Sequence, residues 1–143
     1  MTDRTPYQLL GGDAGVRRLA EVFYDVMDEL EEAATIRAMH AQHMDEIKQK
    51  LYEYLSGWLG GPPLYQRRTG TVCLTEPHRP YAIGPAERDQ WLLCMREALR
   101  RVEASEEVMQ MLELPLFRIA EAIRNREVSP DPSRRDPNLI ASG

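Results

Sequence analysis

The sequence predicts an all-α fold of four main helices, with a long loop between the second and the third. Three observations lead to this prediction. Apolar residues recur every three or four positions in four separate stretches, strong helix-stop residues separate these stretches, and no convincing two-residue alternation of a half-buried strand is present. At 143 residues the chain is near the commonest domain size. We expect one domain over residues 1–127 and a disordered tail over residues 128–143, where apolar periodicity ends.

The first helix is predicted to follow a Gly-Gly pair. Asp13 stands next and has the side-chain chemistry of a helix N-cap. The apolar stripe that follows comprises Val16, Leu19, Ala20, Phe23, Val26, Met27 and Leu30. Tyr24 lies about 100° around the helix from Phe23, at the edge of this stripe. A phenol there can bury its ring while its hydroxyl reaches a cavity, although an ordinary boundary tyrosine would give the same pattern.

A short helical turn is expected around residues 33–39, before the second main helix. That helix is marked by Met44, Ile47, Leu51, Leu55 and Trp58. It should end at Gly60-Gly61-Pro62-Pro63, a strong stop signal. Residues 60–85 then lack sustained periodicity and exceed the roughly 12–15 residues of an ordinary structureless connection. A loop of this length is typically functional.

The third helix is predicted over residues 87–102 and the fourth over residues 106–125. The stripe of the third comprises Trp91, Met95, Ala98 and Val102, with Cys94 beside it; that of the fourth comprises Leu112, Leu116, Ile119, Ala120 and Ile123. Pro115 should kink or divide the fourth helix, because it removes a backbone donor and clashes with the preceding turn.

Composition argues against several classes of partner. The 18 basic and 23 acidic residues give a formal net charge of −5, and the basic residues form no stripe with interleaved aromatic residues, so nucleic acid is not expected. No segment approaches the about 20 apolar residues that span a bilayer, and the first residues carry no secretory-type apolar run. We expect a soluble cytoplasmic protein without a membrane partner, in which Cys73 and Cys94 are reduced.

His78 is the strongest single candidate for a functional residue. It lies between Pro77 and Pro80, and each proline fixes its own φ and pushes the preceding residue toward extended conformations. Such stiffness suits an imidazole that must be presented in one orientation. Taken alone, a surface-loop histidine is nevertheless the commoner explanation.

Short motifs around His78 follow one another in order over residues 6–127. They are Gly11-Gly12, Phe23-Tyr24, Arg37-Ala38-Met39-His40, Leu55-Ser56-Gly57-Trp58-Leu59-Gly60-Gly61-Pro62, Leu64-Tyr65, His78-x-Pro80-x-x-Ile83-Gly84, Glu87-Arg88-Asp89-x-Trp91-Leu92-x-Cys94-Met95 and Arg124-Asn125-Arg126-Glu127. Each motif is weak alone, but their order and spacing resemble the group II truncated haemoglobins. The resemblance implies a two-over-two helical sandwich around haem b, with His78 on the long loop as the proximal iron ligand.

The same resemblance implies a polar ligand-binding side formed by Tyr24, His40 and Trp91. All three side chains can donate a hydrogen bond to a bound O2, which carries partial negative charge. Ile47 corresponds to the distal histidine of many globins and cannot donate. Without the resemblance, Trp91 on an apolar stripe would be assigned to the core.

The resemblance further implies that Leu51, Leu55 and Ile83 contact the cofactor, and that Lys50 and Tyr65 hold its propionates. For Lys50, a solvated helix face is an almost equally good explanation.

The chain departs from its apparent relatives at Glu76-Pro77, where many of them carry basic residues before the histidine. Because neither residue can hold a propionate, Arg67, Arg68 or Arg79 could take over that role.

Three functional hypotheses remain open on sequence alone. The first is a haem protein that binds O2, CO, NO or a similar small ligand, for oxygen transport or for peroxidase-like, nitric oxide dioxygenase-like or sulfide chemistry. A reductase is then a candidate partner, and both a monomer and a homodimer are compatible with the sequence.

The second hypothesis is a zinc module built from His40, His43, Cys73 and His78, and the third is a haem-free helical partner-binding domain. The unusual spacing Cys73-x4-His78 argues against zinc. The Gly-Gly-Pro-Pro loop and the histidine between prolines argue against a haem-free domain.

Overall fold

The computed structural model describes residues 5–39, 45–71 and 81–127, and the regular structure within these ranges is entirely helical. The elements are α1 (Pro6–Leu9), α2 (Gly12–Glu29), η1 (Glu31–Ala33), α3 (Ala34–Ala38), α4 (Asp45–Trp58), α5 (Leu64–Thr69), α7 (Pro85–Arg101) and α8 (Glu106–Ile123). The four long helices α2, α4, α7 and α8 correspond to the four predicted from apolar periodicity, and the expected turn around residues 33–39 is present as η1 and α3.

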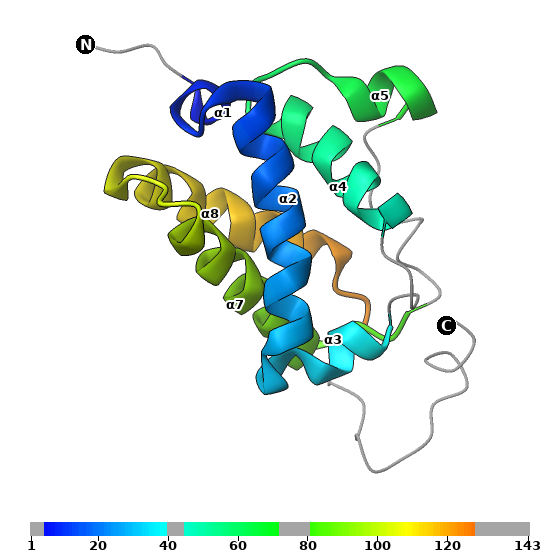
Figure 1. Cartoon of the computed structure of the whole chain (residues 1–143). Coiled ribbons are helices and arrows are strands. Elements are labelled where there is room, and N and C mark those ends of the chain that lie inside the picture. The colour runs from blue at the N-terminus through cyan, green and yellow to red at the C-terminus, as the bar shows by residue number, and fades with distance from the viewer. Residues whose placement is uncertain (1–4, 40–44, 72–80, 128–143) are drawn as a thin grey trace.

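The four long helices form two packed pairs. Helix α2 packs against α4 on one side and against α7 on the other, and α7 packs against α8. In Figure 1, α2 runs down the middle of the molecule with α4 beside it, and α7 and α8 lie on the other side of α2. Helix α2 is therefore the element that joins the two pairs.

The predicted apolar stripes form the core. Helix α2 contributes the most deeply buried stripe, which comprises Val16, Leu19, Ala20, Phe23, Val26 and Met27. Helices α7 and α8 face it with Cys94, Met95, Ala98, Leu99, Val108, Leu112, Leu116 and Ala120. Burying one such aliphatic or aromatic side chain stabilises the fold by about 1.5–3 kcal/mol. The packing of these stripes therefore fixes the spacing of α2, α7 and α8.

The predicted N-cap role of Asp13 is wrong. Helix α2 starts at Gly12, two residues earlier than a cap at Asp13 implies, and its N-cap is Gly11, which has a φ of 104° and contributes no side-chain cap. The Asp13 carboxylate instead accepts hydrogen bonds from the hydroxyl of Tyr52 on α4 and from Arg17 on its own helix. The Asp13 carboxylate thus binds Tyr52, 39 positions away, instead of a backbone N–H of its own helix. The periodicity of apolar residues does not predict such a distant pairing.

The turn after α4 agrees with the stop signal, but the loop that follows is not wholly irregular. Gly60 adopts a φ of 101°, which favours glycine. Gly61 lies so close to the Tyr7 ring that an added Cβ would come within 2.3 Å of it. Helix α5 then follows; it has no buried residue and so leaves no apolar stripe for sequence analysis to detect.

Helix α1 was also not predicted. Thr5 caps it through a reciprocal pair of hydrogen bonds with Gln8, and Pro6 occupies its first turn. The Tyr7 N–H donates to the carbonyl oxygen of Leu59 at 3.0 Å, which attaches this short helix to the end of α4.

Pro115 does not divide the fourth helix. Helix α8 continues through it, from an N-cap at Ser105 to Ile123. Proline removes the donor that the carbonyl of Met111 would otherwise use, but Met111 is 40% exposed, so water can serve that carbonyl.

The predicted tail, residues 128–143, lies outside the described residues. None of the described helices combines the length and the apolarity that crossing a bilayer requires.

Candidate functional site

Phe23 contacts two of the residues assigned to the ligand-binding side. Its ring lies edge-to-face with that of Tyr24, with centroids 5.0 Å apart, and edge-to-face with that of Trp91, with centroids 5.5 Å apart. Edge-to-face packing is a favoured geometry for aromatic pairs. Tyr24 comes from α2 and Trp91 from α7, so the packing of these two helices brings the two residues close together.

Tyr24 is more deeply buried than its position at the edge of the stripe indicated. Only 4% of it is exposed. Burial raises the pKa of its phenol above the ordinary value, because a phenolate would lose hydration there. The hydroxyl therefore remains protonated and able to donate a hydrogen bond.

Trp91 is half-buried, whereas Leu92 and Met95 nearby on α7 are buried. It packs against the core cluster that contains Phe23. Its indole N–H is a donor that does not titrate. The ring therefore packs at the edge of the core, and its role on the ligand-binding side stays a prediction.

Helix α4 presents an apolar stripe of three residues, each one helical turn from the next. Ile47 and Leu51 are half-buried and pack against the core, and Leu55 is buried. None of these side chains can donate or accept a hydrogen bond. The stripe can therefore contact an apolar ring and exclude water, but cannot stabilise a polar ligand.

Ile83, the remaining predicted cofactor contact, is buried and is held by the end of α8. Its N–H donates to Asn125 Oδ1 at 2.8 Å. Its carbonyl oxygen accepts from the backbone N–H groups of Asn125 at 2.8 Å and Arg126 at 3.0 Å. Sequence analysis singled out the motif around Asn125 but assigned it no role.

Glu87 is a second residue whose role the sequence analysis missed. It is only 3% exposed, and its carboxylate accepts the N–H of Gly84 at 2.8 Å, at the start of α7. The available signal was the spacing Gly84-x-x-Glu87, because a glutamate three residues after the N-cap commonly returns to the N-cap backbone.

The predicted propionate partners make other contacts. Lys50 is 47% exposed and pairs with Glu46 one turn earlier on α4, with 3.3 Å between Nζ and Oε1, as expected of a solvated helix face. Tyr65 on α5 packs edge-to-face against Tyr54 on α4, with centroids 5.7 Å apart. Arg68, one of the alternative partners, is ion-paired with Glu53.

Several predicted residues lie outside the described residues: His40, His43, Cys73, Glu76, Pro77, His78 and Arg79. The histidine ligand and all four residues of the zinc hypothesis are therefore untested by the geometry. Within the described ranges, no group of three or more His, Cys, Asp or Glu side chains is arranged to hold a metal ion.

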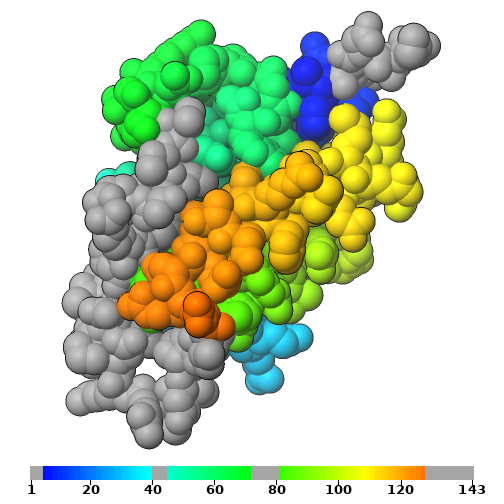
Figure 2. Space-filling view, turned by 180° about the vertical axis from the view of Figure 1, so that it is seen from behind, coloured from blue at the N-terminus to red at the C-terminus, as the bar shows by residue number. Residues whose placement is uncertain are grey.

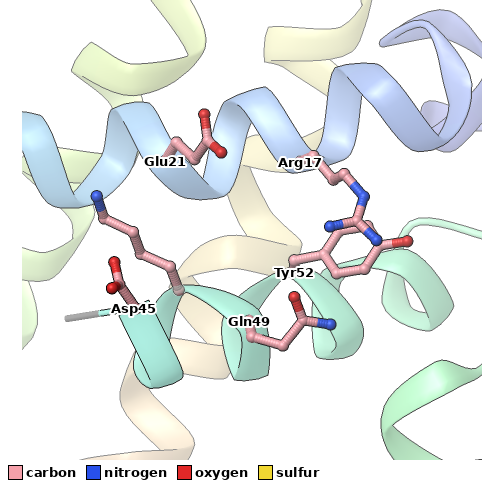
Figure 3. A pocket seen from close by; sticks show the side chains of 6 residues that line it. Arg17, Glu21, Asp45, Gln49 and Tyr52 are labelled. Carbon is pink, nitrogen blue, oxygen red and sulfur yellow. The ribbon is translucent and has the colours of Figure 1, made fainter.

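A small polar pocket lies between α2 and α4. Its volume is about 140 Å³, and its lining residues are Arg17, Glu21, Asp45, Lys48, Gln49 and Tyr52. Figure 3 shows the Arg17 guanidinium over the Tyr52 ring, and the distance from Cζ to the ring centroid is 4.0 Å. Pockets for large ligands are mostly apolar and measure about 300–1,000 Å³. This pocket is therefore not a candidate site for a flat apolar cofactor.

Comparison with known proteins agrees with this arrangement of helices. Residues 5–125 match the family described as bacterial-like globin. The group II 2-on-2 haemoglobin of Agrobacterium tumefaciens is 41% identical, over 89% of this chain and 98% of that one, with a TM-score of 0.83. A cold-adapted truncated haemoglobin of Pseudoalteromonas haloplanktis TAC125 is 36% identical over 87% of this chain and all of that one, also with a TM-score of 0.83.

Among curated proteins, the group 2 truncated haemoglobin YjbI of Bacillus subtilis (strain 168) is 28% identical over 107 residues. These cover 75% of this chain and 78% of that protein. The fold and these comparisons thus define a globin of the two-over-two class. The chain belongs to the bacterial-like globins, and within them to the group II truncated haemoglobins.

Membership of this family implies haem binding and the binding of small diatomic ligands. The chemistry of the described side chains fits a haem group. Ile47, Leu51 and Leu55 offer one apolar face, while Tyr24 and Trp91 add aromatic surface and two hydrogen-bond donors. A few polar groups among mostly apolar contacts is the usual composition of a cofactor site.

Proposed function

We propose that this globin binds haem b through His78 and retains O2 or a similar diatomic ligand by hydrogen bonds from Tyr24 and Trp91. The observation that carries the proposal is the packing of both residues around Phe23, at ring-centroid distances of 5.0 and 5.5 Å. His40 is proposed as a third donor because it matches the motif of the family.

The haem, when bound, would supply an iron atom that takes up the diatomic ligand. The role of Tyr24 is to donate a hydrogen bond that a buried, neutral phenol can supply at any physiological pH. The role of Trp91 is to donate a second bond through an indole whose ring packs edge-to-face on Phe23. Donors oriented in advance require little reorganisation when the ligand arrives.

The apolar residues have a complementary role in the proposal. Ile47 and Leu51 keep water away from the two donors, so that these donors interact with the ligand instead of solvent. Leu51, Leu55 and Ile83 contact the edge or face of the haem ring. The half-buried Leu51 supports this assignment, because it keeps surface that a flat cofactor can cover.

Tyr65 is the first of the two residues proposed to bind the haem propionates. Its hydroxyl is on the short helix α5, and its ring is fixed against Tyr54. Lys50 would have to leave Glu46 to reach a propionate, but the pair is exposed, and exposed pairs are worth only about 0–1 kcal/mol. The ion pair with Glu46 is therefore no obstacle to the assignment of Lys50 as a propionate partner.

We further propose that residues 1–127 form the globin domain, that residues 128–143 are a disordered tail, and that the protein acts in the cytoplasm. The scarcity of cysteines and the low apolar content of the tail support these points.

Oxygen transport and the oxidative removal of peroxide, nitric oxide or sulfide are both compatible with two or three donors beside the iron. A detoxifying role would need a reductase as partner.

The experiment that tests the proposal is an absorption spectrum of the purified protein after addition of haemin. We expect a Soret band with one haem per chain, and its strong weakening or displacement in His78→Ala. His43→Ala is the matched control and should leave the spectrum unchanged. A protein that binds zinc and gives no Soret band, or one in which His43→Ala has the effect expected of His78→Ala, would overturn the proposal.

A further inference from the structure

The segment just after His78 is held by a single side chain from the far end of the chain. Asn125 uses both ends of its amide: Oδ1 accepts the N–H of Ile83 at 2.8 Å, and Nδ2 donates to the carbonyl of Tyr81 at 2.7 Å. Its own backbone N–H donates to the carbonyl of Ile83 at 2.8 Å. One residue thus makes three hydrogen bonds to residues 81–83, and we call this set of contacts the Asn125 clamp.

The next residue of the segment is fixed as well. The N–H of Gly84 donates to the buried carboxylate of Glu87, and the carbonyl of Gly84 accepts the N–H of Arg88 at 3.0 Å. Three of the four residues 81–84, namely Tyr81, Ile83 and Gly84, therefore have backbone groups bound to α7 or to the residues that follow α8. Buried backbone groups that lose such partners are costly, which makes this connection selective for one conformation.

The end of α8 that carries Asn125 is itself attached to α7. Glu121 Oε1 lies 3.2 Å from Arg88 Nη1, and Arg88 also lies over the ring of Phe117, at 5.1 Å from Cζ to the centroid. Arg124 pairs with the same Glu121. Figure 2 shows this end of the chain in orange on the back of the molecule. The clamp is therefore built on two helices that are packed together.

Tyr81 follows His78 by three residues, so the chain can separate their Cα atoms by at most about 11 Å. From this connection we propose that Asn125 is a positioning residue for the haem-ligating histidine. It acts through residues 81–83, which join the loop that carries His78 to α7. The inference rests on the proposed role of His78 as iron ligand. The clamp also fixes the backbone of Ile83, whose side chain is a proposed haem contact.

Two variants separate the parts of the clamp. Asn125→Ala removes both side-chain hydrogen bonds. Asn125→Asp keeps an acceptor for the N–H of Ile83 but places a carboxylate oxygen against the carbonyl oxygen of Tyr81, where two acceptors repel, so its effect should be at least as large as that of Asn125→Ala. The matched control is Ser105→Ala, which removes the N-cap hydrogen bond to Val108 at the opposite end of α8 and lowers stability without touching the clamp.

Three measurements test the proposal, the first on haem-free protein. Amide hydrogen exchange at Ile83 should accelerate in Asn125→Ala. With haem bound, the transfer of haem to an excess of apomyoglobin should be about tenfold faster, the lower end of the effect of losing a group that orients a metal ligand. The iron–histidine stretching band of the ferrous, ligand-free protein should shift or broaden, which a general loss of stability would not cause.

The outcomes distinguish this inference from the proposed function. If wild-type protein takes up no haem, the proposed function fails and the positioning role fails with it. If wild-type protein takes up haem normally but both Asn125 variants retain its haem transfer rate and iron–histidine band, only the positioning role fails. Equal acceleration of haem transfer in Ser105→Ala would also overturn it. Should Asn125→Ala not fold, Asn125→Asp alone decides, and wild-type behaviour in that variant counts against the clamp.

Discussion

Trp91 on α7 packs edge-to-face on Phe23 of α2, with ring centroids 5.5 Å apart and an angle of 63° between the rings. This contact links the two helix pairs at the point where Tyr24 also lies. Contact with the core thus restrains the orientation of the indole, and with it the direction of the indole N–H. The first two predictions follow from this arrangement.

Trp91→Phe should accelerate O2 dissociation from the ferrous haem-loaded protein. The substitution keeps an aromatic ring against Phe23 but removes the indole N–H. Losing one hydrogen bond of about 0.5–1.5 kcal/mol corresponds to a roughly 2- to 10-fold faster rate. Stopped-flow displacement of O2 by CO measures the rate. Trp58→Phe, at a half-buried tryptophan of α4, serves as the control and should leave the rate unchanged, whereas equal effects in the two variants would exclude a specific role for Trp91.

The stabilising contribution of Tyr24 to the fold should decrease in alkaline solution. Burial raises its pKa in the folded state, so the unfolded chain loses the phenolic proton first as the pH rises. Its contribution to stability is complete below the unfolded pKa of about 10 and declines above it, by about 1.4 kcal/mol per pH unit. Urea unfolding between pH 8 and 11 should show a steeper loss of unfolding free energy in wild type than in Tyr24→Phe. Identical slopes would mean that the phenol is solvated.

The hydrogen bond between Tyr52 and Asp13 should stabilise the α2–α4 contact. Tyr52→Phe removes the hydroxyl but keeps the ring under Arg17, so we expect a loss of about 1 kcal/mol in the free energy of unfolding. A double-mutant cycle with Asp13→Ala isolates the pair, because Asp13 also contacts Arg17. Additive effects of the two substitutions would show that the bond contributes nothing.

Cys94 should be unreactive in the folded protein. It is fully buried on α7, and burial raises the pKa of its thiol to about 11. At pH 8 only about one thiol in a thousand would be the reactive thiolate, even before access is considered. In a Cys73→Ser background, a colorimetric thiol reagent should detect this cysteine only after denaturation. Cys94→Ser in the same background is the blank, and rapid reaction in the folded state would show that α7 opens locally.

Helices α2, α7 and α8 were predictable because each buries a stripe of its own surface, whereas the described part of the predicted α4 stripe is buried only at Leu55. The periodicity of α2 around Phe23 and that of α8 around Leu112 therefore appear directly in the sequence. Helix α5 buries no residue, and α1 depends on a cap and a backbone contact to Leu59, so neither leaves a periodic signal. The sequence left open whether Pro115 would kink or divide the fourth helix, and division did not occur. The cost of this proline depends on the exposure of Met111, which is a property of the folded chain.

The candidate site was predicted in its residue types and only partly in its connections. Family motifs indicated Tyr24 and Trp91, but not that Phe23 would contact both. The clamp on Ile83 joins residues 42 positions apart, and the bond between Asp13 and Tyr52 joins residues 39 positions apart. Single-residue patterns do not encode such pairings. His40 and His78 remain predictions, and the spectra proposed above test His78 directly.

The bond between Asp13 and Tyr52 has a mechanical consequence for α4. The other hydrogen bonds described at this end, from the Ser56 hydroxyl to Pro62 and from the Gly61 N–H to Ser56, also restrain the C-terminal half of that helix. All three bonds join α4 to residues outside it, on α2 and in the turn that follows α4. The part of the helix that carries Leu55, a proposed haem contact, is thus tied at both of its flanks, at Tyr52 and at Ser56, to neighbouring parts of the chain.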